Sequence, residues 1–204
     1  ELRVQAELNG ATVVDRASVI TTHLAEVVGQ HAARLLGRED VKMLADLVRR
    51  SHPVVVEELT PAQLSLGEVQ RVLQGLLVEG VAVRDLVRIF EALSLKAQAT
   101  KDPDALVEAA RSALGPAIVA PHLIDGAVHV ISFEPMLEQR MLEAVRPGDQ
   151  GAVVALDPLV GQSVIGELSD LRTAAEERGL RPVVVCAPQL RDRKSTRLNS
   201  SHIP

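Results

Sequence analysis

The sequence LSLGEVQRVLQGLLVEGVAVRDLVRIFEAL, residues 64–93, predicts two helices joined by a short break. Ser65 and Glu68 have the spacing of a capping box, in which each side chain bonds the backbone amide of the other residue. Gly80 suits the position just after a helix, where the backbone turns left-handed. The first helix has an apolar face at helical spacing: Val69, Val72, Leu73, Leu76 and Leu77. In the second helix, we expect Leu86, Val87, Phe90 and Leu93 to point inward and Arg84, Asp85 and Arg88 outward.

A longer helix is predicted upstream of this pair. Asp15 is suited to cap a helix that continues to about Leu36, and Gly37 can close it. Before it, residues 2–8 alternate partly and predict a strand, Asn9-Gly10 predicts a turn, and residues 11–14 predict a short β segment. The apolar face of the helix is expected to enter a core: Val19, Ile20, Leu24, Val27, Val28 and Leu35.

Further helices are expected on both sides of residues 64–93. A helix over residues 38–50 should end at His52-Pro53, because a residue before proline avoids the helical region. Thr60, Pro61 and Gln63 predict one helical turn before Ser65. Asp102-Pro103 opens another helix, and Gly115 marks a break. The inward residues are expected to be Val41, Leu44, Leu47 and Val48 in the first of these helices and Leu106, Val107, Ala110 and Leu114 in the last.

The pattern changes near Gly126, where strands begin to alternate with helices. We expect strands over residues 128–131, 153–156 and 182–187, and helices over residues 135–145 and from Asp157-Pro158 to about Arg178, closed by Gly179. This alternation favours a small parallel or mixed α/β unit. The predicted fold class is therefore α+β, mainly α, with an all-helical subdomain followed by a small, truncated α/β subdomain.

The composition excludes several classes of protein. The 204 residues can form one large or two small domains, and 47% hydrophobic with 24% charged residues is ordinary for a soluble globular protein. No apolar run approaches the roughly 18 residues that span a bilayer, and no secretory signal is visible. Cys186 is the only cysteine, which excludes an intrachain disulfide. A net charge of −5 and only two aromatic residues argue against nucleic-acid binding.

No pattern in the sequence predicts a catalytic, cofactor or metal site. His23 and His31 lie about two turns apart on one predicted helix, which is too far for one metal ion. His122 and His129 flank Asp125 without a regular spacing. The segment from Gly161 to Ile165 begins like a nucleophile elbow, but Ile165 replaces the second glycine, so we interpret it as helix interior.

The charged runs are interpreted as solvated surface. The neighbours Glu57 with Glu58, and Glu176 with Glu177, diverge on a helix and do not form an acid–base couple. The charges at residues 38–40 and at Arg84-Asp85 are expected to be solvated helix ends, with an interface as the alternative.

Several segments resemble the flagellar export-gate family, the FlhA or FHIPEP proteins, and their type III secretion relatives. Residues 72–93, VLQGLLVEGVAVRDLVRIFEAL, are similar to the family's "LQxLLxEGVxIRDLxxIxEAL". Residues 10–24, GATVVDRASVITTHL, resemble "GYTVVDxxxVIATHL" and depart from it at Ala11 and Thr21. Residues 35–48, 102–119 and 182–191 match further family motifs, so the resemblance covers nearly the whole chain.

The resemblance implies a domain organisation. Residues 1–30 would be the end of the first cytoplasmic subdomain, residues 31–125 the helical subdomain, and residues 126–191 the truncated α/β subdomain. Residues 192–204, DRKSTRLNSSHIP, lack apolar periodicity and depart from the family; we interpret them as a non-native tail, with a natural disordered tail as the alternative. The first residue is Glu1 rather than Met, so we expect a fragment truncated at both ends, whose α/β unit would leave apolar surface exposed.

The resemblance also implies a function, which is protein export rather than enzymatic catalysis. Its partners would be export chaperone–substrate complexes, the export ATPase complex and a substrate-specificity switch protein, and the chain would form a homo-oligomeric ring. The ring would lie at the cytoplasmic face of the bacterial inner membrane, reached only through a missing N-terminal part. Thr22 matches a family threonine that lines the chaperone-docking cleft. The alternatives are a virulence-type (injectisome) export gate and an unrelated soluble α/β enzyme with a helical appendage.

Overall fold

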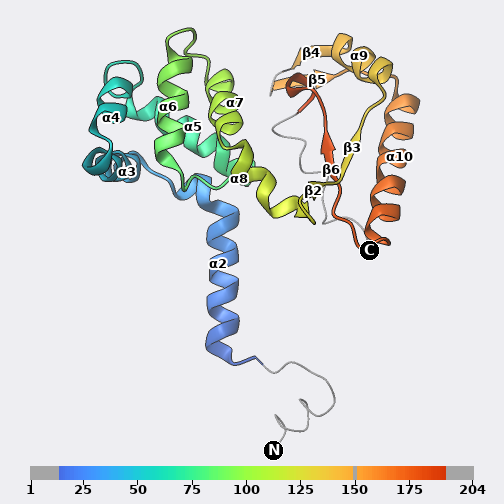
Figure 1. The fold of residues 1–204 in the computed structure, drawn as a ribbon, viewed down its shortest axis with the longest axis horizontal. Helices are drawn as coiled ribbons and strands as arrows, with labels where there is room; N and C mark the ends of the chain where they lie inside the picture. Colours follow the sequence, from blue (N-terminus) through green and yellow to red (C-terminus); the bar gives the residue numbers. More distant parts are fainter. Residues whose placement is uncertain (1–13, 149–150, 192–204) are drawn as a thin grey trace, which may run out of the picture. The chain divides into compact units, whose positions relative to one another are not determined.

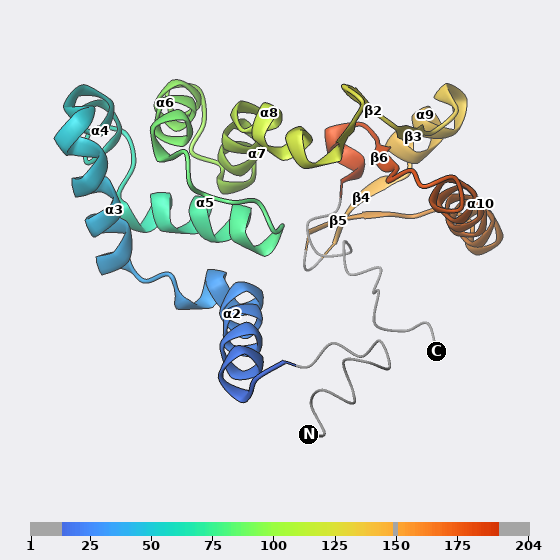
Figure 2. The same ribbon diagram turned by 60° about the horizontal axis from the view of Figure 1, so that its bottom comes forward.

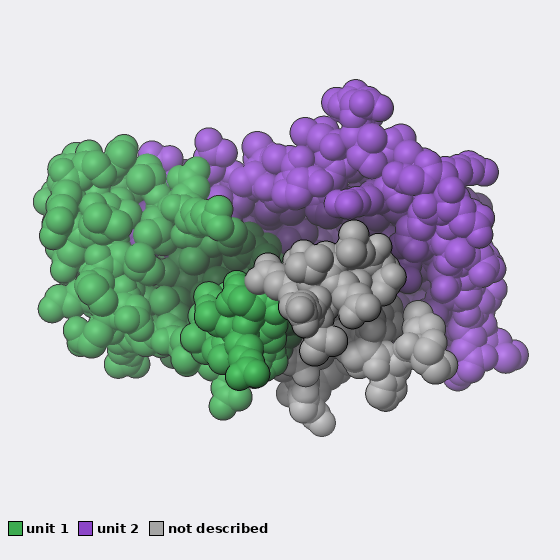
Figure 3. Space-filling model, turned by 90° about the horizontal axis from the view of Figure 1, so that it is seen from below, with its two compact units in different colours: residues 1–87 green, residues 88–204 purple. Residues whose placement is uncertain are grey.

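The computed structural model describes residues 14–148 and 151–191, and these fall into two compact units (Figure 1, Figure 3). The division between the units lies between Val87 and Arg88. The predicted strand over residues 2–8, the turn at Asn9-Gly10 and the tail over residues 192–204 lie outside the described residues, as does most of the short β segment before Asp15.

Helix α2 (Arg16–Leu35) begins where the sequence predicts. The Asp15 side chain accepts a hydrogen bond from the Ser18 amide at 3.0 Å, which satisfies one of the orphan donors of the first turn. Towards its other end the helix packs against α5, and otherwise it extends away from the helices of its unit (Figure 1, Figure 2). The carbonyl of Leu36, just after α2, accepts hydrogen bonds from Gln70 and Gln74 of α5 at 2.9 and 3.0 Å.

The predicted core face of α2 is wrong for the described residues. Its large apolar side chains Val19, Ile20, Leu24, Val28 and Leu35 are between 47% and 67% exposed, and no residue of the helix is fully buried. The periodicity of the sequence identifies a stripe, but no described element covers most of its length.

The first unit is organised around α5 (Leu66–Val78), which packs against both α2 and α3 (Arg38–Ser51). The capping box is confirmed: the Glu68 amide donates to Ser65 Oγ at 3.3 Å, and the Ser65 amide donates to Glu68 Oε2 at 2.7 Å. Gly80 has a φ of +71°, and the amide of Val81 donates to the carbonyl of Leu76, which together end the helix. The buried face is Val69, Val72, Leu73 and Leu76, as predicted, whereas Leu77 is only half-buried.

Two expectations near α3 are wrong. Leu47 is 59% exposed, and Ala45 joins Val41 and Val48 in the core instead. After α3, the sequence forms an unpredicted helix α4 (Pro53–Leu59), which packs against α3. The expected helical turn at Pro61 is a tight turn in which the amides of Gln63 and Leu64 both donate to the carbonyl of Leu59, and the Thr60–Pro61 peptide is cis.

In the second unit, α6 (Leu86–Ala97, mostly in this unit) and α7 (Pro103–Ala113) lie side by side (Figure 1, Figure 2). Asp102 caps α7 by accepting from the Ala105 amide at 2.9 Å, as predicted. All the side chains predicted to point inward in these helices are fully buried, except Val87, which is half-buried. The fully buried hydrophobic residues are Leu86, Ile89, Phe90, Leu93, Ala97, Leu106, Val107 and Ala110, followed by Leu114 after α7. Among the described residues, every fully buried hydrophobic side chain lies between Val41 and Leu114.

A short helix α8 (Gly115–Val119) and a 3-10 turn η1 (Ala120–His122) lead to the α/β part. Strands β1 (Leu123–Ile124) and β2 (Ala127–Val128) form an antiparallel hairpin across Asp125-Gly126, where both residues have positive φ. Strand β3 (Val130–Ser132) pairs in parallel with β6 (Val183–Val185), so the single strand predicted over residues 128–131 is in fact two, divided at His129. Strands β4 (Val145–Gly148) and β5 (Gly151–Val154) pair antiparallel.

The helices of the α/β part are α9 (Pro135–Glu143) and α10 (Pro158–Glu176), followed after β6 by the 3-10 turn η2 (Pro188–Leu190). Helix α9 ends two residues before the predicted Val145, which instead begins β4. Gly179, with a φ of +74°, follows α10 as expected. The fold is therefore mainly helical with a small α/β part, as predicted, and apolar side chains of that part are exposed, among them Leu159 and Val184.

Candidate binding surfaces

Thr22, the residue singled out by the family resemblance, lies exposed in the middle of α2. At about 100° per residue it sits roughly 160° around the helix from Leu24, the centre of the apolar stripe. Its neighbours on that side of α2 are the small residues Ser18, Ala25 and Gly29, together with the exposed carboxylate side chain of Glu26 one turn later. A Cβ added at Gly29 would meet no atom within 4 Å, so the backbone there is openly accessible. The face that carries Thr22 can therefore be approached closely by another chain.

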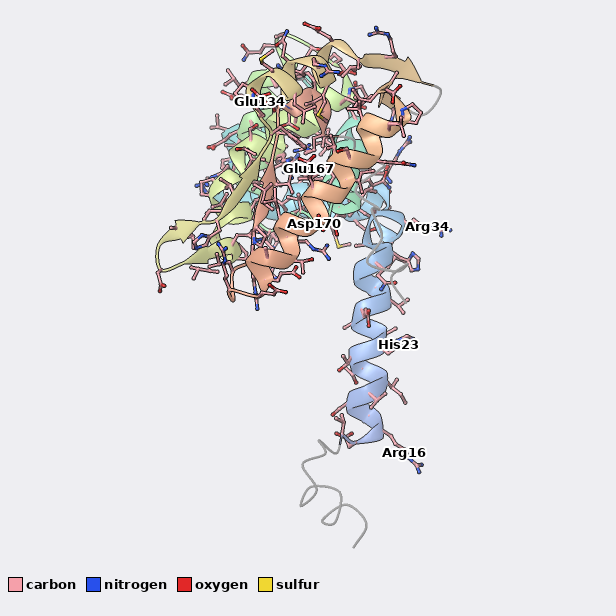
Figure 4. The ribbon with its side chains drawn as sticks, turned by 90° about the vertical axis from the view of Figure 1, so that its right-hand side faces the viewer. Arg16, His23, Arg34, Glu134, Glu167 and Asp170 are labelled. Carbon is pink, nitrogen blue, oxygen red and sulfur yellow. The ribbon has the colours of Figure 1, made fainter. Side chains whose placement is uncertain are left out.

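A line of basic side chains runs between the Thr22 face and the apolar stripe. Arg16, His23 and Arg34 point to the same side of α2 (Figure 4). At the start of the helix, hydrogen bonds from the Ser18 hydroxyl and amide lower the pKa of Asp15, so this cap is charged at neutral pH. Helix α2 thus presents three different surfaces: the apolar stripe, the line of Arg16, His23 and Arg34, and the face that carries Thr22.

The first unit contains an open hollow of about 550 Å³ beside α3. Arg38, Lys42 and Arg49 line it at spacings that keep them within about 40° on one side of α3. Ala45 and the carboxylate residue Asp46 lie between them along the helix, and Pro61 and Leu66 form an apolar wall. The Arg38 guanidinium lies against Gly67, where an added Cβ would stand 3.4 Å from it. We call this site the basic hollow.

Cations of the basic hollow are only partly neutralised. Arg49 pairs with Asp46 one turn earlier on the same helix. No carboxylate of a described residue lies within ion-pair distance of Arg38 or Lys42. From the sequence, Arg38 is expected to belong to a solvated helix end. The spacing of the three cations was the signal that could have identified the side of α3 that they share.

An acidic row lies on the outer side of α10, formed by Glu167, Asp170 and Glu177, all exposed (residues 167 and 170 are labelled in Figure 4). Glu167 accepts a hydrogen bond from Ser163 at 3.1 Å. Within the described residues, no ion-pair partner lies near any of the three. The neighbouring Glu176, by contrast, pairs with Arg172 at 3.3 Å.

A second hollow, of about 510 Å³, lies between the start of α7 and η2. Its walls include Asp102, Asp104 and Lys96, and Glu108, which pairs with Arg191 at 2.6 Å. Nearby, Glu138 of α9 accepts from the Ala187 amide at 2.6 Å and so ties α9 to the segment after β6. Burial, and to a lesser extent the Glu138 carboxylate, raise the pKa of the Cys186 thiol, which is therefore protonated at neutral pH.

The described residues contain no group of three histidine, cysteine or acidic side chains that could hold a metal ion. The segment from Gly161 to Ile165 is helix interior within α10, as interpreted from the sequence. In residues 14–148 and 151–191, no helix is both long and apolar enough to cross a membrane.

Comparisons with known proteins converge on one family. The profile of the FHIPEP family matches residues 1–203. The flagellar biosynthesis protein FlhA of Bacillus subtilis is 37% identical over 191 residues, which cover 92% of this chain and 28% of that protein. The chain thus spans less than a third of the length of this curated relative.

Solved structures with the same fold are similarly longer. The chain in the cryo-EM structure of nonameric SctV-C from EPEC aligns with a TM-score of 0.69 and 28% identity, over 83% of this chain and 53% of that one. The structure of the Chlamydia pneumoniae CdsV and CdsO complex aligns with a TM-score of 0.69 and 25% identity, over 93% of this chain and 56% of that one.

Proposed function

The chain belongs to the FHIPEP family, and we propose that it is part of the cytoplasmic domain of a flagellar type III export gate, which receives chaperone–substrate complexes for secretion. The flagellar relative is 37% identical, whereas the SctV-C structure is 28% identical, and this difference favours a flagellar gate over a virulence-type gate. The match to the FHIPEP family is what favours an interaction module over an enzyme.

Four segments form the proposed organisation. Residues 1–30 end the first cytoplasmic subdomain, residues 31–125 are the helical subdomain and residues 126–191 are the α/β subdomain. Residues 192–204 form a separate tail, over most of which the family profile still extends. The exposed stripe of α2 supports the first assignment, because large apolar side chains at 47% to 67% exposure need a cover, and the rest of the first subdomain would supply it. The module would then lie on the cytoplasmic side of the inner membrane.

The observation that carries the docking proposal is the position of Thr22. It is exposed on the side of α2 that faces away from the apolar stripe, beside Ser18, Ala25 and Glu26. If the stripe packs against the first subdomain, the Thr22 face stays available for a partner. The threonine can then supply one hydrogen bond and one methyl contact without steric bulk.

The remaining partners are proposed from the family. Nonameric SctV-C supports a homo-oligomeric ring, and the complex of CdsV with CdsO supports a second protein as a partner. The export ATPase complex and a substrate-specificity switch protein would be further partners of the same ring.

The docking proposal is tested by Thr22→Met in a gate protein that carries the complete cytoplasmic domain. We expect the larger side chain to obstruct the cleft and to weaken the binding of a chaperone–filament-protein complex about tenfold, equivalent to about 1.4 kcal/mol. Isothermal titration of the purified variant and its parent measures the change. The fold should survive, because Thr22 is exposed, and circular dichroism checks this.

The matched control is Thr21→Met. Thr21 is the same residue type on the next position, also exposed, and its hydroxyl donates to the Ala17 carbonyl at 2.8 Å. It points about 100° away from Thr22. Equal affinities for Thr22→Met and the parent, with both proteins folded, would remove Thr22 from the docking site.

A further inference from the structure

The basic hollow is a positive surface on an acidic chain. The chain carries a formal net charge of −5, yet Arg38 and Lys42 share one side of α3 with no carboxylate of a described residue within ion-pair distance. Arg49 has a partner, Asp46, but both side chains are 46% exposed, and ion pairs at such positions add little. The field of the hollow therefore favours an acidic surface as its occupant.

The acidic row on α10 has a matching spacing. At a rise of about 1.5 Å per residue, Lys42 and Arg49 lie about 6 and 16.5 Å along the helix from Arg38. On α10, Asp170 and Glu177 lie about 4.5 and 15 Å from Glu167. Two helices laid side by side in parallel can therefore place all three cations within about 1.5 Å of register with three carboxylates.

Apolar groups accompany the charges on both surfaces. Pro61 and Leu66 form a wall of the basic hollow, and Leu171, 54% exposed, lies beside the acidic row. An interface needs such contacts, because ion pairs at its rim contribute more to specificity and to the association rate than to affinity.

We propose that the basic hollow of one copy of this chain docks on the acidic row of α10 of a second copy. This inference rests on the proposed ring, because a closed ring joins each subunit to the next through two different, complementary surfaces. A contact between one basic and one acidic surface can repeat around such a ring without placing two surfaces of the same charge against each other.

The test is a set of charge reversals in the full chain, measured by sedimentation velocity at millimolar concentration in low salt. Lys42→Glu and Asp170→Lys should each weaken self-association about tenfold, because each places like charges opposite one another. The double variant carries the net charge of the parent and should recover most of the association. Added salt should weaken the parent and the double variant alike.

Two controls separate this contact from the effect of net charge. Arg50→Glu changes the net charge as Lys42→Glu does, but Arg50 lies about 100° around α3 from the centre of the three cations. Glu176→Lys changes the net charge as Asp170→Lys does, but Glu176 lies about 140° around α10 from the centre of the acidic row. Both control variants should self-associate within about twofold of the parent.

Net charge alone makes the opposite prediction for one variant, since Asp170→Lys brings the chain closer to neutrality and would strengthen self-association. That result, a parent that stays monomeric, or a double variant that fails to recover would each overturn the proposed contact. The chaperone titration with Thr22→Met involves neither α3 nor α10, so failure of one proposal is distinguishable from failure of the other.

Discussion

Leu73 and Leu47 are the same residue type in neighbouring helices of the first unit, and they should respond very differently to truncation. Leu73 is fully buried in α5, which packs against both α2 and α3, whereas Leu47 is 59% exposed on α3. The change to alanine removes the same atoms from both sites and leaves helix propensity almost unchanged. The difference between the two variants therefore measures burial.

The expected cost follows from the packing of α5. Leu73→Ala removes the transfer free energy of the lost methyl groups and leaves a cavity at a fully buried position, so we expect the free energy of unfolding to fall by about 3 kcal/mol. Leu47→Ala should change it by less than about 0.5 kcal/mol. Urea titration followed by circular dichroism measures both values, provided that the slopes with denaturant agree.

Hydrogen exchange of the α5 amides supplies a second measurement, because a chain with two compact units can unfold in more than one step. Leu73→Ala should accelerate exchange in α5, while Leu47→Ala should leave it unchanged. If truncation of Leu47 costs as much as truncation of Leu73, the described packing of α3 and α5 is refuted.

Two smaller perturbations test the ends of helices. Gly80→Ala should lower the free energy of unfolding in urea by about 1 kcal/mol, because the φ of +71° disfavours any Cβ although the space there is open. Gly80→Asn should lower it less, since asparagine tolerates this left-handed conformation better, and equal losses would contradict this explanation. The lowered pKa of Asp15 means that its capping contribution is complete above the ordinary value of 3.8 and is lost as pH falls through the lower value of the folded chain. Acidification below about pH 4 should therefore reduce the helicity of α2 in the parent but not in Asp15→Ala, as circular dichroism can measure; the same loss in both would exclude the cap as its cause.

The parts of the fold that were predicted correctly depend on neighbours in the sequence. The capping box of Ser65 and Glu68, the caps at Asp15 and Asp102, and the left-handed Gly80 all involve residues within a few positions of each other. Such interactions are visible in any sequence that contains the spacing.

The errors arise where distant residues decide the outcome. On α3, Ala45 rather than Leu47 faces the core, because Ala45 lies about 40° from Val41 around the helix while Leu47 lies about 120° away, and the size of the side chain misled the prediction. Strand β3 pairs with β6 more than fifty positions later, so its bounds cannot follow from local alternation. Periodicity identified the stripe of α2 but not what covers it.

The candidate sites also combine features that the sequence predicts with features that it does not. Helical periodicity places Thr22 away from the apolar stripe, and the structure shows it exposed there. Its side-chain chemistry alone does not distinguish it from an ordinary surface threonine. The family motif singles out Thr22, and its exposed position opposite the apolar stripe is what makes docking there possible. For the basic hollow, by contrast, the sequence contains part of the site and the fold supplies the rest. The spacing of Arg38, Lys42 and Arg49 predicts that they share one face of α3. Only the fold shows that the turn at Pro61 and the start of α5 form the other walls of the hollow. A charged row becomes a candidate binding surface when a second element gives it shape, and that second element is the part that sequence periodicity does not contain.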